Sequence, residues 1–210
     1  MTIEDVLDRG VVPIVAILRG VQTHEAVPIA NALVDAGIKL IEVPFNSPDP
    51  AGSIAAMAQG VGDRAAIGGG TVTSPALAET LAGAGGTFMV SPNVDPAVIH
   101  RSLDLGMDVL PGFLTPTEAF AAINAGATSL KLFPGSVLGS GYVKAIGEVL
   151  PNGTRVWAVG GVGPANVAEF RAAGVFGIGV GGSLYKPGDD AETVGARARA
   201  LVEAWAASER

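Results

Sequence analysis

Short apolar segments alternate with longer amphipathic segments along almost the whole chain. The short segments are rich in Val, Ile, Leu and Phe and are bounded by glycine, proline or polar residues, a pattern typical of buried strands. The longer segments often begin near proline and end before glycine, as helices do. We therefore expect strands at Val12–Leu18, Leu40–Phe45, Ala66–Val72, Phe88–Ser91, Val109–Phe113, Ser129–Phe133, Arg155–Gly160 and Gly177–Gly181. Helices are expected at His24–Ala36, Pro50–Gly60, Pro75–Ala84, Asp95–Leu105, Pro116–Ala125, Tyr142–Leu150, Pro164–Ala172 and Asp190–Ser208.

Each expected strand is followed by a helix, eight times over, with no linker-like gap between the units. This order favours a parallel sheet, and the number eight predicts a closed (β/α)₈ TIM barrel. An open, doubly wound sheet remains the alternative, because periodicity does not show whether a sheet closes. We expect one domain over residues 1–210, with a short helix at Ile3–Leu7 across the bottom of the barrel.

Composition and charge narrow the class of protein. Residues of apolar type make up 49% of the chain, and its length suffices for a large core. The net charge is −7 without a basic block, which argues against nucleic acid or anionic membranes as partners. Cysteine is absent, so disulfides, thiol chemistry and sulfur-ligated zinc are excluded. Asp5, Asp8 and Arg9 interrupt the N-terminus before any long apolar run, so we expect no signal peptide and a cytoplasmic location.

One expected strand, Ser129–Phe133, carries a lysine in its interior. Alternation places Ser129, Lys131 and Phe133 on one face of the strand and the two leucines on the other. If the leucines pack against helices, Lys131 points into the barrel. A lysine held away from water has a lowered pKa, and its neutral amine can form a Schiff base with a carbonyl substrate. Lys131 is therefore our candidate nucleophile.

Glu42 is the candidate partner of Lys131. It alternates with Ile41 and Val43, which places it on the opposite face from those apolar neighbours. An inward carboxylate could carry protons through the steps of a Schiff-base reaction. The alternative is a buried structural ion pair between Lys131 and Glu42, because perturbed charges mark functional sites only in some proteins.

Other candidate residues lie where strands end, which is the functional face of such barrels. Arg19 ends the first strand, and its planar guanidinium could bind a substrate carboxylate or form a salt bridge with Glu42 at the rim. Thr71 follows the run Gly68-Gly69-Gly70, which either brings the backbone close to a small ligand or makes a kink at the strand end.

Two glycine-rich turns follow the last two strands and predict a phosphate site. They contain Gly160 and Gly161 in the first turn, and Gly181, Gly182 and Ser183 in the second. Glycine lets backbone N–H groups approach a phosphate closely, and these two loops are the frequent phosphate site of TIM barrels. Backbone donors need no net positive charge, which suits an acidic protein. The alternative is two tight turns without a ligand.

The histidines and carboxylates argue against other chemistries. His24 and His100 lie in expected helices and not at strand ends, so a histidine-based triad or a histidine metal site is disfavoured. No cluster of carboxylates occurs among the expected strand ends. We expect no metal and no cofactor.

These motifs, taken in order, resemble the class I 2-keto-3-deoxy-6-phosphogluconate/6-phosphogalactonate aldolase family. They are Ile17-Leu18-Arg19-Gly20, Ile41-Glu42-Val43-Pro44-Phe45-Asn46-Ser47-Pro48, Ile67-Gly68-Gly69-Gly70-Thr71-Val72, Ser91-Pro92-Asn93, Leu110-Pro111-Gly112, Leu130-Lys131-Leu132-Phe133-Pro134, Ala158-Val159-Gly160-Gly161-Val162 and Gly181-Gly182-Ser183. The resemblance implies a (β/α)₈ fold, a homotrimer, and reversible cleavage of a phosphorylated 2-keto-3-deoxy sugar acid to pyruvate and glyceraldehyde 3-phosphate.

The same resemblance implies roles for particular residues. Lys131 would form the Schiff base, and Glu42 would be the general acid and base. The residues implied at the pyruvate end and the pocket wall are Arg19, Thr71, Pro92 and Phe133. Those implied to bind the phosphate are Gly161, Gly181, Gly182 and Ser183, beside Gly160.

Two positions bear on the substrate. Members that act on the gluconate compound usually carry Arg where this chain has Asn46, and Thr where it has Val159. Both departures resemble the galactonate branch, whereas Gly182-Ser183 resembles the gluconate branch. A hydroxyl lost beside C4 of the substrate can change which epimer is preferred. We expect the galactonate compound as substrate, with phosphogluconate or 4-hydroxy-2-oxoglutarate as the alternative and a non-catalytic sugar-phosphate binding barrel as a third hypothesis.

Overall fold

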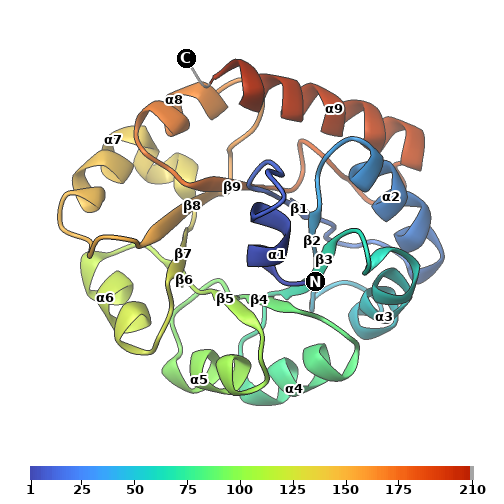
Figure 1. Ribbon diagram of the computed structural model, residues 1–210, viewed down its shortest axis with the longest axis horizontal. Coiled ribbons are helices and arrows are strands. Elements are labelled where there is room, and N and C mark those ends of the chain that lie inside the picture. Colours follow the sequence, from blue (N-terminus) through green and yellow to red (C-terminus); the bar gives the residue numbers. More distant parts are fainter. Residues whose placement is uncertain (209–210) are drawn as a thin grey trace.

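A computed structural model describes residues 1–208 and has a ring of parallel strands surrounded by helices (Figure 1). The strands are β1 (Ile14–Ile17), β2 (Leu40–Pro44), β3 (Ala66–Gly70), β4 (Phe88–Val90), β5 (Asp108–Leu110), β6 (Gly112–Phe113), β7 (Ser129–Leu132), β8 (Arg155–Val159) and β9 (Gly177–Val180). The helices are α1 (Ile3–Leu7), α2 (Thr23–Asp35), α3 (Pro50–Val61), α4 (Pro75–Gly83), α5 (Pro96–Asp104), α6 (Pro116–Asn124), α7 (Gly135–Gly147), α8 (Val167–Ala172) and α9 (Ala191–Ala207).

The sheet closes on itself, so the barrel prediction is confirmed and the open sheet is excluded. Neighbouring strands pair in the order β5-β4-β3-β2-β1-β9-β8-β7-β6, and the pairs are parallel. The first and last strands of the chain pair directly, with Val15 opposite Gly179. The two ends of the order, β5 and β6, are consecutive in sequence and are separated only by Pro111.

The expected strand Val109–Phe113 is therefore two strands, and Pro111 is the reason. Proline has no N–H to donate, so it interrupts a hydrogen-bonded ladder. Its carbonyl still accepts a hydrogen bond from the Lys131 amide at 2.9 Å, which joins the two halves to β7. The prediction of eight strands was wrong in number for the described residues, although the eight-unit arrangement is as expected.

Helix starts follow the sequence signals closely. Proline occupies the first turn of α3, α4, α5 and α6. The preceding polar side chains accept hydrogen bonds from first-turn amides, as Asp49 does from Gly52 at 3.1 Å and Ser74 from Leu77 at 3.3 Å. These caps fix where each strand-to-helix loop ends, and so the positions of the loops at the barrel mouth.

Two predicted helix starts were wrong. The helix expected at Tyr142–Leu150 begins at Gly135, with a break at Gly139, whose φ is 70°. Its glycine-rich first half has low helix propensity, but the Ser136 amide is held by the Gly160 carbonyl at 2.9 Å. The helix expected from Pro164 begins at Val167, because the residues before it form a loop described below.

The barrel interior is a core of its own. It comprises Ile3, Val6, Val15, Ile17, Leu40, Ala66, Phe88, Val90, Leu110, Trp157 and Val159. Two glycines make room for its largest rings: a Cβ at Gly68 would lie 2.6 Å from the Phe88 ring, and one at Gly177 would lie 2.4 Å from Trp157. The interior is thus packed with side chains below the mouth, as in TIM barrels generally.

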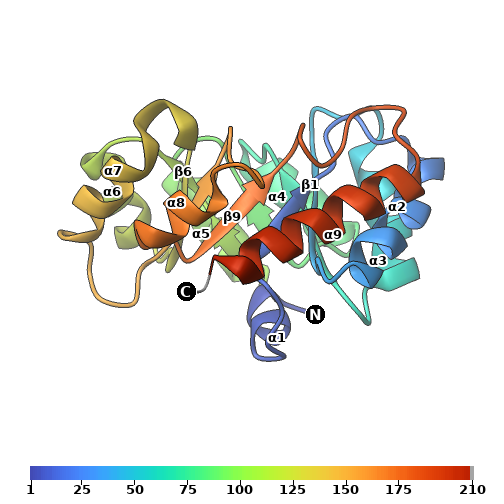
Figure 2. The same cartoon turned by 90° about the horizontal axis from the view of Figure 1, so that it is seen from above.

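Helix α1 closes the bottom of the barrel, as the sequence predicted. Its buried residues Ile3 and Val6 belong to the interior core, and Figure 2 shows the helix below the ring of strands. The Ile3 amide donates to Asp108 Oδ2 at 2.7 Å, which ties the helix to the start of β5. One end of the barrel is therefore filled, and the loops at the other end remain for ligand binding. Within residues 1–208, no helix is both long and apolar enough to span a bilayer.

Candidate active site

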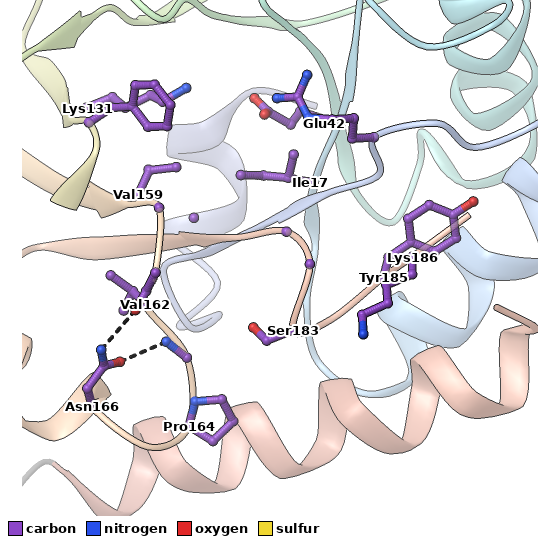
Figure 3. A pocket seen from close by; sticks show the side chains of 18 of the residues that line it. Ile17, Glu42, Lys131, Val159, Val162, Pro164, Asn166, Ser183, Tyr185 and Lys186 are labelled. Atoms are coloured by element: carbon purple, nitrogen blue, oxygen red, sulfur yellow. Dashed lines mark hydrogen bonds between the residues drawn. The ribbon is translucent and has the colours of Figure 1, made fainter. Parts of the chain in front are cut away.

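A cavity of about 670 Å³ lies at the carboxyl ends of the strands (Figure 3). Many of the sequence-predicted residues line it, namely Arg19, Glu42, Lys131, Phe133, Val159, Gly160, Gly161, Gly181, Gly182 and Ser183. They come from β2, β7 and β8 and from the loops after β1, β7, β8 and β9, so the barrel brings together residues from distant parts of the chain.

Lys131 enters the cavity from β7. Its side chain is only 6% exposed, whereas its neighbours Leu130 and Leu132 pack into the outer core between sheet and helices. The Lys131 Nζ atom lies 4.7 Å from the centroid of the Phe133 ring, which comes from the same face of the strand. The alternation seen in the sequence therefore holds, and the amine is enclosed by protein and not by bulk water.

Glu42 enters from β2 and is 2% exposed. A glycine in the neighbouring strand gives it space: a Cβ at Gly70 would lie 2.7 Å from Glu42 Oε1. Its Oε2 atom is buried without a hydrogen-bond partner among residues 1–208. A buried carboxyl oxygen left unsatisfied is costly, and it is available to a ligand or a water molecule.

Lys131 and Glu42 point toward one another across the cavity (Figure 3). Within the described part of the chain no hydrogen bond or ion pair joins them, so a gap separates the two groups. Burial lowers the pKa of the Lys131 amine, and the Glu42 charge opposes this shift only in part. Burial likewise raises the pKa of the Glu42 carboxyl, against the opposing effect of Lys131 and Arg19. Burial therefore shifts the amine toward its neutral form and the carboxyl toward its protonated form, while the attraction between their charges acts in the opposite direction.

Arg19 lies at the rim, held by the neighbouring loop. Its guanidinium donates a hydrogen bond to Asn46 Oδ1, and the next amide, that of Gly20, donates to Ser47 Oγ at 3.0 Å. These two bonds tie the loop after β1 to the loop after β2. The salt bridge between Arg19 and Glu42, raised as the alternative role of Arg19, is not formed among the described residues, although the positive charge of Arg19 acts on the pKa of both Glu42 and Lys131.

The two glycine turns face each other at the other end of the cavity. Gly160 and Gly161 have φ angles of 93° and 74°, a conformation that favours glycine. Within residues 1–208 the amides of Gly161, Gly182 and Ser183 donate to no protein acceptor. Unused N–H groups from two adjacent turns are suited to binding an anion.

Comparison with known proteins agrees with this geometry. The family profile described as "Aldolase: KDPG and KHG aldolase" matches residues 3–196, which is most of the chain. The chain belongs to the KDPG and KHG aldolase family.

Three relatives are similar over nearly their whole length. The protein named "Probable 2-dehydro-3-deoxy-6-phosphogalactonate aldolase" from Rhizobium meliloti (strain 1021) is 48% identical over 92% of this chain and 91% of its own. The protein named "2-dehydro-3-deoxy-6-phosphogalactonate aldolase" from Escherichia coli (strain K12) is 45% identical over 92% of this chain and 94% of its own. The solved structure titled "Native KDPGal structure" superposes with a TM-score of 0.92 and 44% identity, over 94% of this chain and 96% of that one.

Three residues that the resemblance implied at the substrate do not line the cavity of this aldolase. Asn46 accepts a hydrogen bond from Arg19 but does not line the wall, and neither Thr71 nor Pro92 lies on the wall. Thr71 has a φ of 58°, which is unusual for a residue branched at Cβ. Their contact with substrate stays a prediction.

The run Gly68-Gly69-Gly70 leaves space for the side chains that pack against it. A Cβ at Gly69 would lie 2.8 Å from Leu81 and from Phe45, and the other two glycines admit Phe88 and Glu42 as described above. Neither alternative raised from the sequence, close approach to a small ligand or a kink at the strand end, accounts for all three glycines. The run is a site where large side chains pack directly on the backbone.

Sequence reasoning missed several residues of the cavity wall. Asn166 holds the first glycine turn, because its Oδ1 accepts from the Gly163 amide and its Nδ2 donates to the Gly161 carbonyl, both at 2.9 Å. Tyr185 and Lys186 line the cavity from the loop after β9. Burial, with the charges of Glu25 and Asp189, raises the pKa of Tyr185 to about 12. The position of Asn166, between a glycine-rich turn and the next helix, was a usable signal because asparagine often bonds to backbone groups in turns, whereas nothing in the sequence marked Tyr185.

No metal site accompanies these residues in the described part of the chain, where no group of three or more His, Asp or Glu side chains is close enough to hold an ion. His24 and His100 lie in the helices α2 and α5, as expected.

Replacing Glu42 should move the pKa of Lys131 in a defined direction. The Glu42 carboxylate raises the pKa of the amine, so Glu42→Gln should shift the Lys131 titration midpoint to lower pH. The midpoint is measured by trace acetylation at a series of pH values, followed by peptide mapping. Lys144, exposed in α7, is the control for the overall extent of acetylation in the same samples. A Lys131 midpoint that stays in place or rises would contradict the electrostatic coupling.

Proposed function

We propose that this aldolase reversibly cleaves 2-dehydro-3-deoxy-6-phospho-D-galactonate to pyruvate and D-glyceraldehyde 3-phosphate through a Schiff base on Lys131. The observation that carries the proposal is the buried Lys131 amine, which faces the Glu42 carboxyl across an open gap. Burial favours the neutral amine that must attack a ketone. It also favours the protonated carboxyl that must donate a proton.

The proposed steps use these two groups in turn. The Lys131 amine adds to the C2 ketone, and the protonated Glu42 carboxyl gives its proton to the departing hydroxyl, so water leaves and an iminium forms. The Glu42 carboxylate then takes the proton of the C4 hydroxyl as the C3–C4 bond breaks. The bonding electrons pass to the iminium, which becomes an enamine, and glyceraldehyde 3-phosphate is released. Protonation of the enamine at C3 and hydrolysis return pyruvate and the free amine.

The rest of the cavity supports a substrate with an anion at each end. Arg19 lies nearer the reacting groups, since its charge acts on both, and it suits the carboxylate of the keto acid. The unused amides of Gly161, Gly182 and Ser183 suit the phosphate. Phe133 and Val159 supply apolar wall between these ends.

The choice of the galactonate compound rests on Val159 and on the relatives. Val159 lines the cavity and offers no hydroxyl to orient the C4 hydroxyl of the substrate. Both curated relatives at 45% and 48% identity are named for the galactonate compound. The phosphogluconate and 4-hydroxy-2-oxoglutarate activities are the alternatives within the same family.

We also propose that the protein is a homotrimer in the cytoplasm. Besides Phe133 on the cavity wall, the exposed large apolar side chains lie between residues 103 and 149. They are Leu103, Leu114, Phe120, Val137, Leu138 and Val149. Such a concentration favours burial against a second copy of the chain. Cell fractionation checks the location.

Incubation with pyruvate and borohydride should attach a three-carbon acid to Lys131, because reduction makes the imine permanent. Peptide mapping by mass spectrometry locates the added mass. Lys131→Ala should abolish both the adduct and turnover while the circular dichroism spectrum is retained, and Lys144→Ala should behave as the parent does. Turnover without Lys131, or an adduct on another lysine, would end the Schiff-base proposal.

Cleavage of the two C4 epimers should differ, with a higher kcat/KM for the galactonate compound than for the gluconate compound. Val159→Thr should lower the ratio of kcat/KM for the galactonate compound to kcat/KM for the gluconate compound by about tenfold or more. The reason is that a hydroxyl beside C4 adds a hydrogen bond for the gluconate epimer. Rates are followed by coupling pyruvate release to lactate dehydrogenase. An equal or reversed preference in the parent protein would favour the sibling activity.

Sedimentation equilibrium should give a mass three times the 21.0 kDa of one chain. A monomer or dimer at micromolar concentration would contradict the proposed trimer. The measurement is independent of activity, so it does not bear on the reaction.

A further inference from the structure

One charged side chain on the cavity wall has no part in the chemistry described above. Lys186 follows Tyr185 in the loop after β9, its side chain is exposed, and Figure 3 shows it at the Ser183 end of the cavity, away from Lys131. Among residues 1–208 its ammonium group forms no hydrogen bond or ion pair. An unpaired cation beside two turns with unused amides is available to a bound anion.

The backbone of Lys186 is fixed without the use of its ammonium group. The Lys186 amide donates to Asp189 Oδ2 at 2.8 Å, and the Asp189 amide donates back to the Lys186 carbonyl at 3.0 Å. The carboxylate of Asp189 also pairs with Arg197. The direct ion pair of Asp189 is with Arg197, and Lys186 interacts with this carboxylate only through the weaker attraction of its charge, so within the described residues its ammonium group has no direct partner.

The loop of Lys186 packs against the loop of Arg19. A Cβ at Gly20 would lie 2.8 Å from Pro187 Cγ, so glycine is needed there for the two loops to touch. Gly20 follows Arg19, and Pro187 follows Lys186. The contact therefore sets the spacing between two cations that lie on the wall of one cavity.

The charges on the cavity wall suggest that Arg19 and Lys186 contact different ends of a ligand. The described cavity wall carries three basic side chains: Arg19, Lys131 and Lys186. Lys131 must be neutral to react, and Arg19 is bound to Asn46 and acts on the Lys131–Glu42 pair. A phosphate monoester carries nearly two negative charges at neutral pH. In a protein of net charge −7, Lys186 is the remaining group that can offset that charge.

We propose that Lys186 pairs with the phosphate of the substrate, beside the amides of Gly182 and Ser183, and makes this aldolase select phosphorylated substrates. The proposal deepens the proposed function and rests on it. An ammonium on a flexible stem supplies a point charge, whereas the amides supply direction. Because the phosphate does not react, Lys186 should act on binding and leave bond cleavage unchanged.

The test compares phosphorylated and unphosphorylated forms of the same sugar acid. Lys186→Met keeps the length of the side chain and removes its charge. It should raise KM for the phosphorylated substrate about five- to twenty-fold and leave kcat nearly unchanged. This range of KM corresponds to the loss of an interaction stronger than a typical exposed ion pair and no stronger than a hydrogen bond to a charged group. Kinetics on the unphosphorylated form should not change. Lys186→Arg should keep most of the affinity, and Lys144→Met, a control for loss of a surface charge, should match the parent.

Two further measurements separate this proposal from the proposed reaction. Titration with inorganic phosphate, followed by calorimetry, should show weaker binding to Lys186→Met whatever the substrate of the enzyme is. Borohydride trapping of pyruvate, which has no phosphate, should proceed alike in both proteins. Equal effects on both sugar acids, or unchanged phosphate binding, would overturn the role of Lys186. Failure of trapping in the parent protein would overturn the reaction instead and leave the phosphate titration to decide on Lys186.

Discussion

The candidate active site depends on an amine and a carboxyl group that are kept apart and shielded from water inside one barrel. The directions of the two pKa shifts, down for Lys131 and up for Glu42, have a common cause in burial. Each shift lowers the free energy of unfolding, over a pH range that follows from its direction. The Lys131 cost appears as pH falls below the ordinary lysine pKa, and the Glu42 cost appears as pH rises above the ordinary glutamate pKa. Both costs are present at neutral pH.

The surrounding fold offsets these costs. Apolar side chains of the interior core, Leu40 and Trp157 among them, fill the barrel, and a second apolar layer lies between strands and helices. Replacing a buried charged pair by apolar residues often leaves a protein equally stable or more stable, by about 1–4 kcal/mol. The presence of Lys131 and Glu42 inside the barrel is therefore better explained by the proposed reaction than by a contribution to the stability of the fold. The reading of Lys131 and Glu42 as a structural ion pair also lacks the direct contact that such a pair requires.

Strand alternation and turn signals carried most of what could be predicted from sequence. The period of two along a strand is fixed by backbone geometry, so Lys131 and Glu42 could be placed inside the barrel from their neighbours alone. Proline and capping residues located most helix starts for the same local reason. Closure of the ring and the interruption at Pro111 depend on pairing between distant strands, which local patterns do not contain. The helix break at Gly139 depends likewise on a contact between Ser136 and Gly160.

The filled bottom of the barrel has a consequence for the order of events in the proposed reaction. With α1 and the interior core closing one end, reactants must come and go by the mouth. In the proposed reaction, the three-carbon acid joined to Lys131 would occupy the deep position, and the phosphorylated aldehyde would lie between it and the solvent. In the cleavage direction the aldehyde is therefore released first, and in the reverse direction pyruvate binds first. The five-residue helix α1, on the opposite side of the barrel from the mouth, thus helps to set the order in which substrates bind and products leave.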